Sequence, residues 1–287
     1  MFTKRSKNGI IYYTSPLFDK YGITHMFATR IGGVSSGAFE SLNVSTTRKD
    51  ESGNTDSARN IEENYRRALS VIGAVPENSV AAKQLHEGTV LLVGNEHGGR
   101  GILANFAEMP GGDGLIAKKD GGINAVCVKT ADCVPILLKN IKTGDISAVH
   151  AGWRGTSSDI VTNAVIKLSD GKPEDIVAAI GPCIGRCCYE IGGEVYSRFE
   201  ILFKSKDKDY DMTMLFTLMP SCSMGGSTYL DLARANSELL RFAGVKSENI
   251  DVSGMCTCCF SDEGVFPFFS HRASGGYSGT FVSAIAL

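Results

Sequence analysis

A cysteine and a histidine stand beside strand-like apolar runs within one stretch of this chain, residues 129–156. Cys133 lies between the runs AVCVKT and VPILL, and His150 follows the run DISAV. Residues at strand ends, next to loops, are often functional. A thiol and an imidazole suit a metal site, and they equally suit a nucleophile with its base. The local sequence leaves both kinds of chemistry open.

A third donor is found in the segment SVAAKQLHEGTVLLV, where His86 lies between two strand-like runs. With Cys133 and His150 it would give three nitrogen and sulfur ligands, the set of a catalytic zinc site with a fourth position open. The separations of 47 and 17 residues follow no local spacing rule, so the fold must bring the three together. Histidines of this kind are also common as plain structural residues.

Two aspartates close to these donors have simpler interpretations. Asp113 belongs to an Asp-Gly pair, which is a turn signal, and we expect it to be structural. Asp132 directly precedes Cys133. It could orient a ligating histidine, or it could be a plain turn residue.

Positively charged side chains near glycines are candidates for binding an anion. After His150 the chain turns through glycines, with Arg154 between them, into a helical pattern. A strand, a glycine turn and a helix can hold an anion at the helix N-terminus. Arg30 ends another strand-like run before a glycine pair, and a solvated loop arginine would explain it equally well.

The elements that must position these residues alternate between strands and helices. We expect strands over 9–15, 25–29, 121–138, 176–180 and at the C-terminal end, and helices over 60–73, after Gly155, over 192–204 and over 231–243. Asn60 is the expected N-cap of the first helix. The helix after Gly155 should bury Ile160, Val161, Ala164, Val165 and Leu168. The pattern predicts one α/β domain over 1–287, with sheets inside and helices outside, and a variable surface excursion at 204–228.

Composition excludes several classes of protein. The 287 residues are 43% hydrophobic and 21% charged, as in ordinary globular proteins. A net charge of −2 gives no electrostatic case for nucleic acid or an anionic membrane. The N-terminal segment lacks the apolar core of a signal peptide, and no apolar run approaches the roughly 18 residues of a membrane span. We expect a cytoplasmic protein.

The nine cysteines are most simply small buried hydrophobic residues of a reducing compartment. They include two clusters that could form a thiolate metal site, although the chain lacks the two C-x-x-C motifs of the usual site. These clusters are Cys183, Cys187 and Cys188, and Cys256, Cys258 and Cys259.

Several longer motifs resemble one family. TADC followed by VPILL, AVHAGWRG, AAIGPCIGRCCYEIG, FATRIGGVSSGAFESLN, KQLHEGTV and FFSHR are similar to motifs of the YfiH-type laccase-domain family, and they span about residues 25–272. The resemblance implies an α/β domain with central sheets between helical layers. It places zinc ligands on His86, Cys133 and His150. Family members are associated with purine nucleoside phosphorolysis, some with adenosine deamination, and bacterial members with editing of peptidoglycan composition.

The chain departs from the family pattern near its C-terminus. Members often carry two arginines where His271-Arg272 stands, and a Thr-Gly-Arg element where this chain has residues 277–280. Substrate preference would differ if that arginine contacts substrate. The His271-Arg272 pair could lie near the site or cover the core, and we favour the second. A multicopper oxidase needs many histidines, mostly in His-x-His pairs, and this chain has five histidines and no such pair. Copper in the single site remains conceivable, since copper outranks zinc in intrinsic affinity.

These observations favour a zinc-dependent purine nucleoside phosphorylase of the adenosine, inosine, guanosine and methylthioadenosine class, with adenosine deaminase activity as an additional expectation. Phosphate would attack the ribose C1′, and in deamination a zinc-activated water would attack the purine C6. Arg30, Asn43 and Arg154 would bind phosphate or nucleoside. Three alternatives stay open. They are a cysteine hydrolase of peptidoglycan precursors with Cys133 as nucleophile and His150 as base, a single-site metal-dependent phenol oxidase, and a non-catalytic binding protein.

Overall fold

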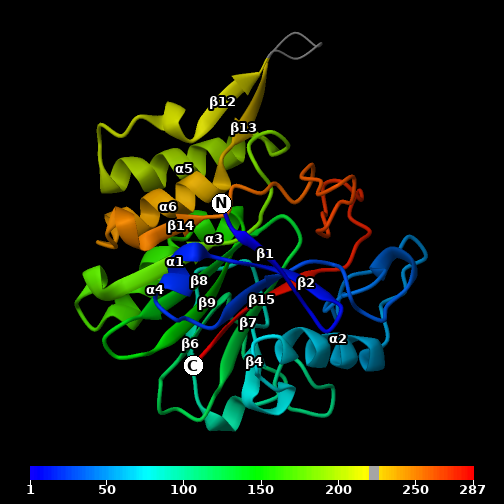
Figure 1. Ribbon diagram of the computed structural model, residues 1–287. Helices are drawn as coiled ribbons and strands as arrows, with labels where there is room; N and C mark the ends of the chain where they lie inside the picture. Colours follow the sequence, from blue (N-terminus) through cyan, green and yellow to red (C-terminus); the bar gives the residue numbers. More distant parts are fainter. Residues whose placement is uncertain (220–225) are drawn as a thin grey trace.

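Two six-stranded sheets stacked face to face form the centre of the molecule in the computed structural model, which describes residues 1–219 and 226–287 (Figure 1). Helices cover the outer face of each sheet, so the order of layers is helix, sheet, sheet, helix. The predicted α/β class, with sheets sandwiched between helical layers, is confirmed.

The first sheet joins the two ends of the chain to its middle. Its strands are antiparallel neighbours except for the parallel pair β4–β7. In spatial order they are β1 (Thr3–Lys7), β2 (Ile10–Thr14), β3 (His25–Ala28), β15 (Phe281–Ala286), β7 (Ala125–Thr130) and β4 (Ser79–Ala81).

The second sheet contains the predicted strand that follows Cys133 and the predicted strand that carries His150, whereas the strand before Cys133 is β7 of the first sheet. It is antiparallel at its centre and parallel at both edges, in the pairs β10–β14 and β5–β6. In spatial order its strands are β14 (Ile250–Val252), β10 (Ile176–Ile180), β8 (Val134–Asn140), β9 (Ile146–Ala151), β6 (Gly114–Ala117) and β5 (Val90–Val93).

Between the sheets, inward-facing side chains from both form one apolar core. Phe27, Val128 and Phe281 of the first sheet share it with Leu137 and Ala148 of the second, and all five are fully buried. Strands buried on both faces read as nearly continuous apolar runs, which is why 125–138 and 176–180 were recognisable in the sequence.

The helices bury one face each against the sheets. α2 (Ala58–Ser70) covers the first sheet, and α4 (Ile160–Ser169) and α6 (Leu232–Phe242) cover the second. α5 (Gly193–Lys206) contributes Phe199 and Phe203 to the same apolar cluster as α4 and α6. Two shorter helices are α1 (Pro16–Lys20) and α3 (Trp153–Ser157). The buried face predicted for α4 is confirmed at all five positions, and Asp231 caps α6 by accepting a hydrogen bond from Arg234 N at 2.9 Å.

Two local predictions were wrong. The N-cap of α2 is Ser57, whose hydroxyl accepts a hydrogen bond from Asn60 N, because the helix begins one turn earlier than Asn60. The helical pattern after Gly155 is not one helix. Asp159 adopts a left-handed φ of 58° and separates α3 from α4.

A small third sheet lies beyond α5, and one of its strands, β12, falls within the surface excursion predicted for 204–228. It contains β11 (Glu190–Ile191), β13 (Ser227–Leu230) and β12 (Phe216–Met219), and β12 and β13 form the hairpin at the top of Figure 1. Part of the predicted excursion, residues 220–225, lies outside the described residues.

Across the described ranges of the chain, no helix is both long enough and apolar enough to cross a membrane.

Candidate metal centre and substrate pocket

The fold brings His86, Cys133 and His150 together, with one ligand atom of each within 4.8 Å of the other two. His86 comes from the loop between β4 and β5, Cys133 from the bend between β7 and β8, and His150 from β9. The antiparallel register of β8 and β9 sets Pro135 opposite His150, so Cys133 reaches the same end of the sheet. The two imidazole rings meet edge to face, with centroids 4.9 Å apart.

A buried aspartate, Asp113, organises both histidines. Its Oδ1 lies 2.8 Å from His150 Nδ1, and its two oxygens accept hydrogen bonds from the backbone N–H groups of Leu85, His86 and Glu87 at 2.9–3.0 Å. His86 has a left-handed φ of 63°, and these three successive N–H groups converge on one carboxylate. Because Nδ1 of His150 bonds to Asp113, its Nε2 is the nitrogen available for a ligand.

The two aspartates therefore exchange the roles that the sequence suggested. Asp113, expected to be a turn residue, orients His150. Asp132, considered as the orienting residue, accepts hydrogen bonds from Thr257 Oγ1 and from Arg272 N, both at 2.7 Å, and holds loops beside Cys133. Sequence gave no local signal for the Asp113 contact, since His150 is 37 residues away.

The backbone of Gly152 passes close to the three donors, and the lack of a side chain there leaves room for them. A Cβ on Gly152 would lie 3.0 Å from Cys133 Sγ, 3.4 Å from His86 Cδ2 and 3.7 Å from His150 Cε1. The glycine turn after His150 thus packs against the donor set. The helix that follows it, α3, has five residues, and Arg154 stacks on Trp153 with its guanidinium carbon 4.4 Å from the ring centroid.

Charge is paired within the donor set. Burial alone raises the pKa of the Cys133 thiol, but His150 and His86 outweigh it and lower that pKa to about 6. Burial lowers the pKa of His150, but Cys133 and Asp113 outweigh it and raise that pKa to about 9. Without a metal ion the pair is therefore a thiolate and an imidazolium at neutral pH, and a bound cation would displace the imidazolium proton, since a histidine ligand is neutral. The donor types, the Asp113 contact and the Gly152 approach all fit a bound metal ion.

A cavity of about 340 Å³ opens directly onto these donors, and His86, Cys133 and His150 are part of its wall. Its apolar wall comes from α2 and the loops around 102–109, with Ile61, Ile102, Leu103, Phe106 and Met109. This volume lies within the range of small-molecule sites, and a mainly apolar wall with a few polar groups is their usual character.

The polar part of the cavity wall includes two threonine hydroxyls that lack a hydrogen-bond partner among the described residues. Thr130 at the end of β7 and Thr280 before β15 both line the cavity, and no described residue hydrogen-bonds to either buried hydroxyl. Arg48 and Lys129 add positive charge to the wall. Burial lowers the pKa of Lys129 to about 8.

The three residues predicted to bind substrate do not line this cavity. Arg30 stacks on Phe269, with its guanidinium carbon 4.6 Å from the ring centroid, and Arg154 is exposed on α3. Asn43 is fully buried and bonds to Asp56 Oδ2 and to the N–H groups of Ser45 and Thr280. Since Ser45 and Thr280 line the cavity, any influence of Asn43 on a substrate is indirect.

The remaining histidines lie apart from the donor set. His25 is buried, accepts a hydrogen bond from Ser15 N at 2.7 Å, and has a pKa lowered by that burial. His97 lies in a loop turn, as expected. His271 is exposed rather than covering the core, and its Nδ1 lies 2.7 Å from Nη1 of Arg48, which lines the cavity. The divergent C-terminal motif therefore touches the edge of the pocket.

Comparison with known families and proteins identifies the family of the chain. Residues 24–287 match the family described as multi-copper polyphenol oxidoreductase laccase. The chain belongs to this laccase-like family. Family relatives include the purine nucleoside phosphorylase of Bacteroides thetaiotaomicron, 32% identical over 268 residues, covering 92% of each chain. Another is the purine nucleoside phosphorylase YlmD of Geobacillus stearothermophilus, 34% identical over 267 residues, which are 90% of this chain and 87% of that protein.

Solved structures of the laccase-like family share the whole fold. The crystal structure of YlmD from Geobacillus stearothermophilus superposes with a TM-score of 0.84 at 30% identity, covering 99% of this chain and 98% of that one. The Bacillus licheniformis protein YfiH gives a TM-score of 0.81 at 26% identity, with the same coverage. The resemblance to the YfiH-type family inferred from the motifs is confirmed.

Proposed function

We propose that this chain is a zinc-dependent purine nucleoside phosphorylase, and that adenosine deamination is a second reaction of the same pocket. The observation that carries the proposal is the set of three donors, His86, Cys133 and His150, in the wall of a cavity of about 340 Å³. The relatives named purine nucleoside phosphorylase, at 32–34% identity over nine-tenths of the chain, support the same reaction class.

Zinc suits the donor set better than a group of copper ions. Two imidazoles and one thiolate are common zinc ligands, and three protein ligands leave a fourth position open, as in catalytic zinc sites. A bound zinc ion would supply a Lewis acid at the inner end of the pocket. The family description names a multicopper enzyme, but two of the five histidines, His86 and His150, contribute to this site, which is too few imidazoles for several copper ions.

The pocket wall offers complementary contacts for a nucleoside. Apolar side chains such as Ile102 and Phe106 suit the flat faces of a purine. The hydroxyls of Thr130 and Thr280 are buried and await partners, so they suit the polar edge of the base or the ribose hydroxyls. A ligand that bonds to them recovers hydrogen bonds that are not made among the described residues.

The cations of the same wall suit the phosphate that phosphorolysis consumes. Arg48 offers a planar guanidinium, and Lys129 a point charge at the end of β7. A phosphate held by these groups would attack the ribose C1′ through an oxygen, while the glycosidic bond breaks and its electron pair leaves with the purine. Arg30 and Arg154 were predicted for this role, but neither lines the cavity.

A product assay tests the proposal. Purified protein is incubated with adenosine or inosine, with and without phosphate, beside Cys133→Ala and a control, Cys127→Ala, which removes a buried thiol outside the pocket wall. We expect phosphate-dependent release of free base and ribose-1-phosphate in the parent and control proteins, and its loss in Cys133→Ala. Inosine formed from adenosine without phosphate would show deamination. Full activity in Cys133→Ala, or no conversion by protein that contains zinc, would overturn the proposal.

One observation favours a second candidate. Cys133, His150 and Asp113 form a series of thiol, imidazole and carboxylate that resembles the arrangement of a cysteine hydrolase. Such an enzyme would act on a peptidoglycan precursor without metal. A thiolate bound to zinc is a poor nucleophile, so protection of Cys133 from alkylation by zinc would favour the phosphorylase. Turnover of a precursor by metal-free protein would favour the hydrolase.

A further inference from the structure

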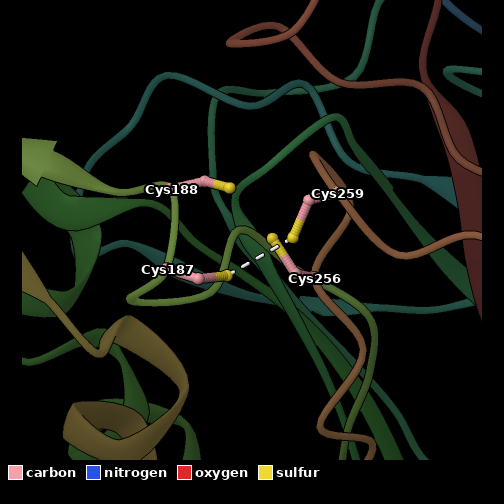
Figure 2. A group of neighbouring side chains, drawn as sticks. All are labelled: Cys187, Cys188, Cys256 and Cys259. Atoms are coloured by element: carbon pink, nitrogen blue, oxygen red, sulfur yellow. Dashed lines mark hydrogen bonds between the residues drawn. The ribbon is translucent and has the colours of Figure 1, made fainter.

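Four cysteine side chains meet at a second place in the molecule, outside the pocket. Figure 2 shows Cys187 and Cys188 on one loop facing Cys256 and Cys259 on another. Their sulfur atoms all lie within 4.8 Å of one another, and all four are free thiols. None of them lines the cavity that contains Cys133.

The parallel pairing of β10 and β14 explains why two distant segments meet here. Ile180 lies opposite Val252 at the end of this pair. Beyond it, the backbones of Cys183 and Cys256 pair in an isolated parallel β-bridge. Thr257 N donates to Cys183 O at 2.9 Å, which holds the two segments in register. Each segment then turns, at 186–188 and at 257–259, and both turns carry cysteines.

The distances suit a metal ion better than a disulfide. With Zn–S bonds of about 2.3 Å, a tetrahedral site sets its sulfurs about 3.8 Å apart. Cys187 Sγ and Cys259 Sγ are 3.4 Å apart, and the other pairs fall within 4.8 Å. A disulfide would use two of the four thiols and leave the other two without a function.

The backbone beside the cluster favours a thiolate at Cys256. Gly185 N donates to Cys256 Sγ at 3.2 Å, and hydrogen bonds to the charged form of a group favour that form. Gly185 has no side chain to intrude, since a Cβ there would lie 3.2 Å from Cys187 Sγ. Cys187 and Cys259 are exposed, so a metal ion can reach the cluster from solvent.

We propose that Cys187, Cys188, Cys256 and Cys259 bind a structural zinc ion through four thiolates. Four protein ligands close the coordination sphere, so this ion would hold the two loops together and take no part in the reaction. The proposal does not depend on which substrate the pocket accepts.

The position of the cluster gives the ion a defined structural role. Arg272 Nη1 donates to Cys188 O at 2.8 Å, and Arg272 N donates to Asp132 Oδ2 at 2.7 Å. Thr257, inside the second cysteine turn, donates its hydroxyl to Asp132 Oδ1 at 2.7 Å. The second cysteine loop therefore contacts Asp132 directly and the first through Arg272, so a zinc ion between the loops would position the turn that precedes Cys133.

Metal analysis of matched variants tests the proposal. We expect two zinc ions per chain in the parent protein, and one in the double variant Cys187→Ser with Cys259→Ser. Cys133→Ala should also keep one, and the combination of all three substitutions none. Cys258→Ser is the control, because Cys258 lies in the same turn but outside the group of four. Circular dichroism shows whether each variant is folded, and Cys188→Ser provides an independent ligand substitution.

Cobalt(II) serves as a second probe that does not depend on activity. Metal-stripped Cys133→Ala refilled with cobalt(II) should show intense sulfur-to-cobalt charge-transfer absorption, which is lost with Cys188→Ser. Three results would overturn the proposal. These are an unchanged metal count in the folded double variant, loss of metal in Cys258→Ser, and a Cys187–Cys259 disulfide in freshly purified protein by mass spectrometry.

The metal counts also separate this proposal from the proposed enzyme activity. If the parent holds two ions and Cys133→Ala one, while no nucleoside is converted, the structural zinc site stands and the phosphorylase proposal fails. If nucleosides are converted but the double cysteine variant keeps the parent's metal count, the phosphorylase proposal stands and the structural zinc proposal fails.

Discussion

Nδ1 of His150 lies 2.8 Å from Oδ1 of Asp113, and both side chains are almost fully buried. Burial alone would raise the pKa of Asp113, but hydrogen bonds from His150 and from the N–H groups of Glu87 and Leu85 lower it. The carboxylate therefore stays charged at neutral pH and fixes the imidazole so that Nε2 faces the other donors. One residue links the His86 loop to the β9 histidine.

Replacing this carboxylate should weaken metal binding. In Asp113→Asn the amide has one oxygen to accept the four hydrogen bonds now made, so His150 loses its fixed orientation. Loss of such a partner typically costs about 10–100-fold in metal affinity. Zinc titration against a competing chelator measures the effect, with the exposed Asp120→Asn as control. Unchanged affinity in folded Asp113→Asn would contradict the role assigned to Asp113.

Adding a methyl group at Gly152 should disturb the same site from the other side. Its Cβ would lie 3.0 Å from Cys133 Sγ, and overpacking typically costs about 1–3 kcal/mol. We therefore expect Gly152→Ala to bind zinc about tenfold more weakly, or worse. Gly192→Ala is the matched control, because nothing lies within 4 Å of a Cβ there. Equal zinc affinity in both variants would show that the site has more room than the distances indicate.

Removing the Thr130 hydroxyl should affect substrate and leave folding intact. The hydroxyl has no hydrogen-bond partner among the described residues, so Thr130→Val loses no such bond in the free protein. A neutral hydrogen bond to substrate is worth about 0.5–1.5 kcal/mol, which predicts a nucleoside KM about 2–10-fold higher with unchanged Tm. Ser283→Ala removes a buried hydroxyl that also lacks a partner but lies outside the pocket. Its KM should not change, and parallel changes in both variants would argue against substrate contact.

The charge of Lys129 should make phosphate use depend on pH. Burial lowers its pKa to about 8, so the ammonium is charged below about pH 8 and becomes neutral above it. We expect the KM for phosphate to rise as the pH passes 8. Lys129→Met should raise this KM at lower pH and remove the rise, whereas Lys129→Arg should move the rise to higher pH. Lys172→Met, on the surface, is the control. A profile identical in parent and Lys129→Met would exclude the role.

The fold class and the three donors could be predicted from the amino-acid sequence. Apolar runs marked the buried strands of 125–138 and 176–180, because strands covered on both faces need no polar residue. The apolar face of α4 followed from helical periodicity. His86, Cys133 and His150 were recognisable from motifs, although their separations alone predicted nothing.

The polar residues that surround those donors depend on how the strands and loops pack. Asp113 reaches His150 because β6 pairs with β9, with Gly114 opposite Val149, and no local pattern reports that pairing. Arg30, Asn43 and Arg154 were chosen from loops at strand ends. Packing instead places Arg48, Lys129 and the two threonines in the pocket wall, since the side of a loop that faces a cavity depends on the neighbouring elements.

The group of Cys187, Cys188, Cys256 and Cys259 also combines a local sequence signal with contacts that only the fold creates. Cys256 and Cys259 stand at C-x-x-C spacing, which is a local signal for a thiolate metal site. A single pair cannot close a four-ligand site, and the partners Cys187 and Cys188 lie about 70 residues away. Only the parallel alignment of β10 with β14 brings the two turns within reach, because hydrogen bonding between strands fixes where the loops beyond them begin.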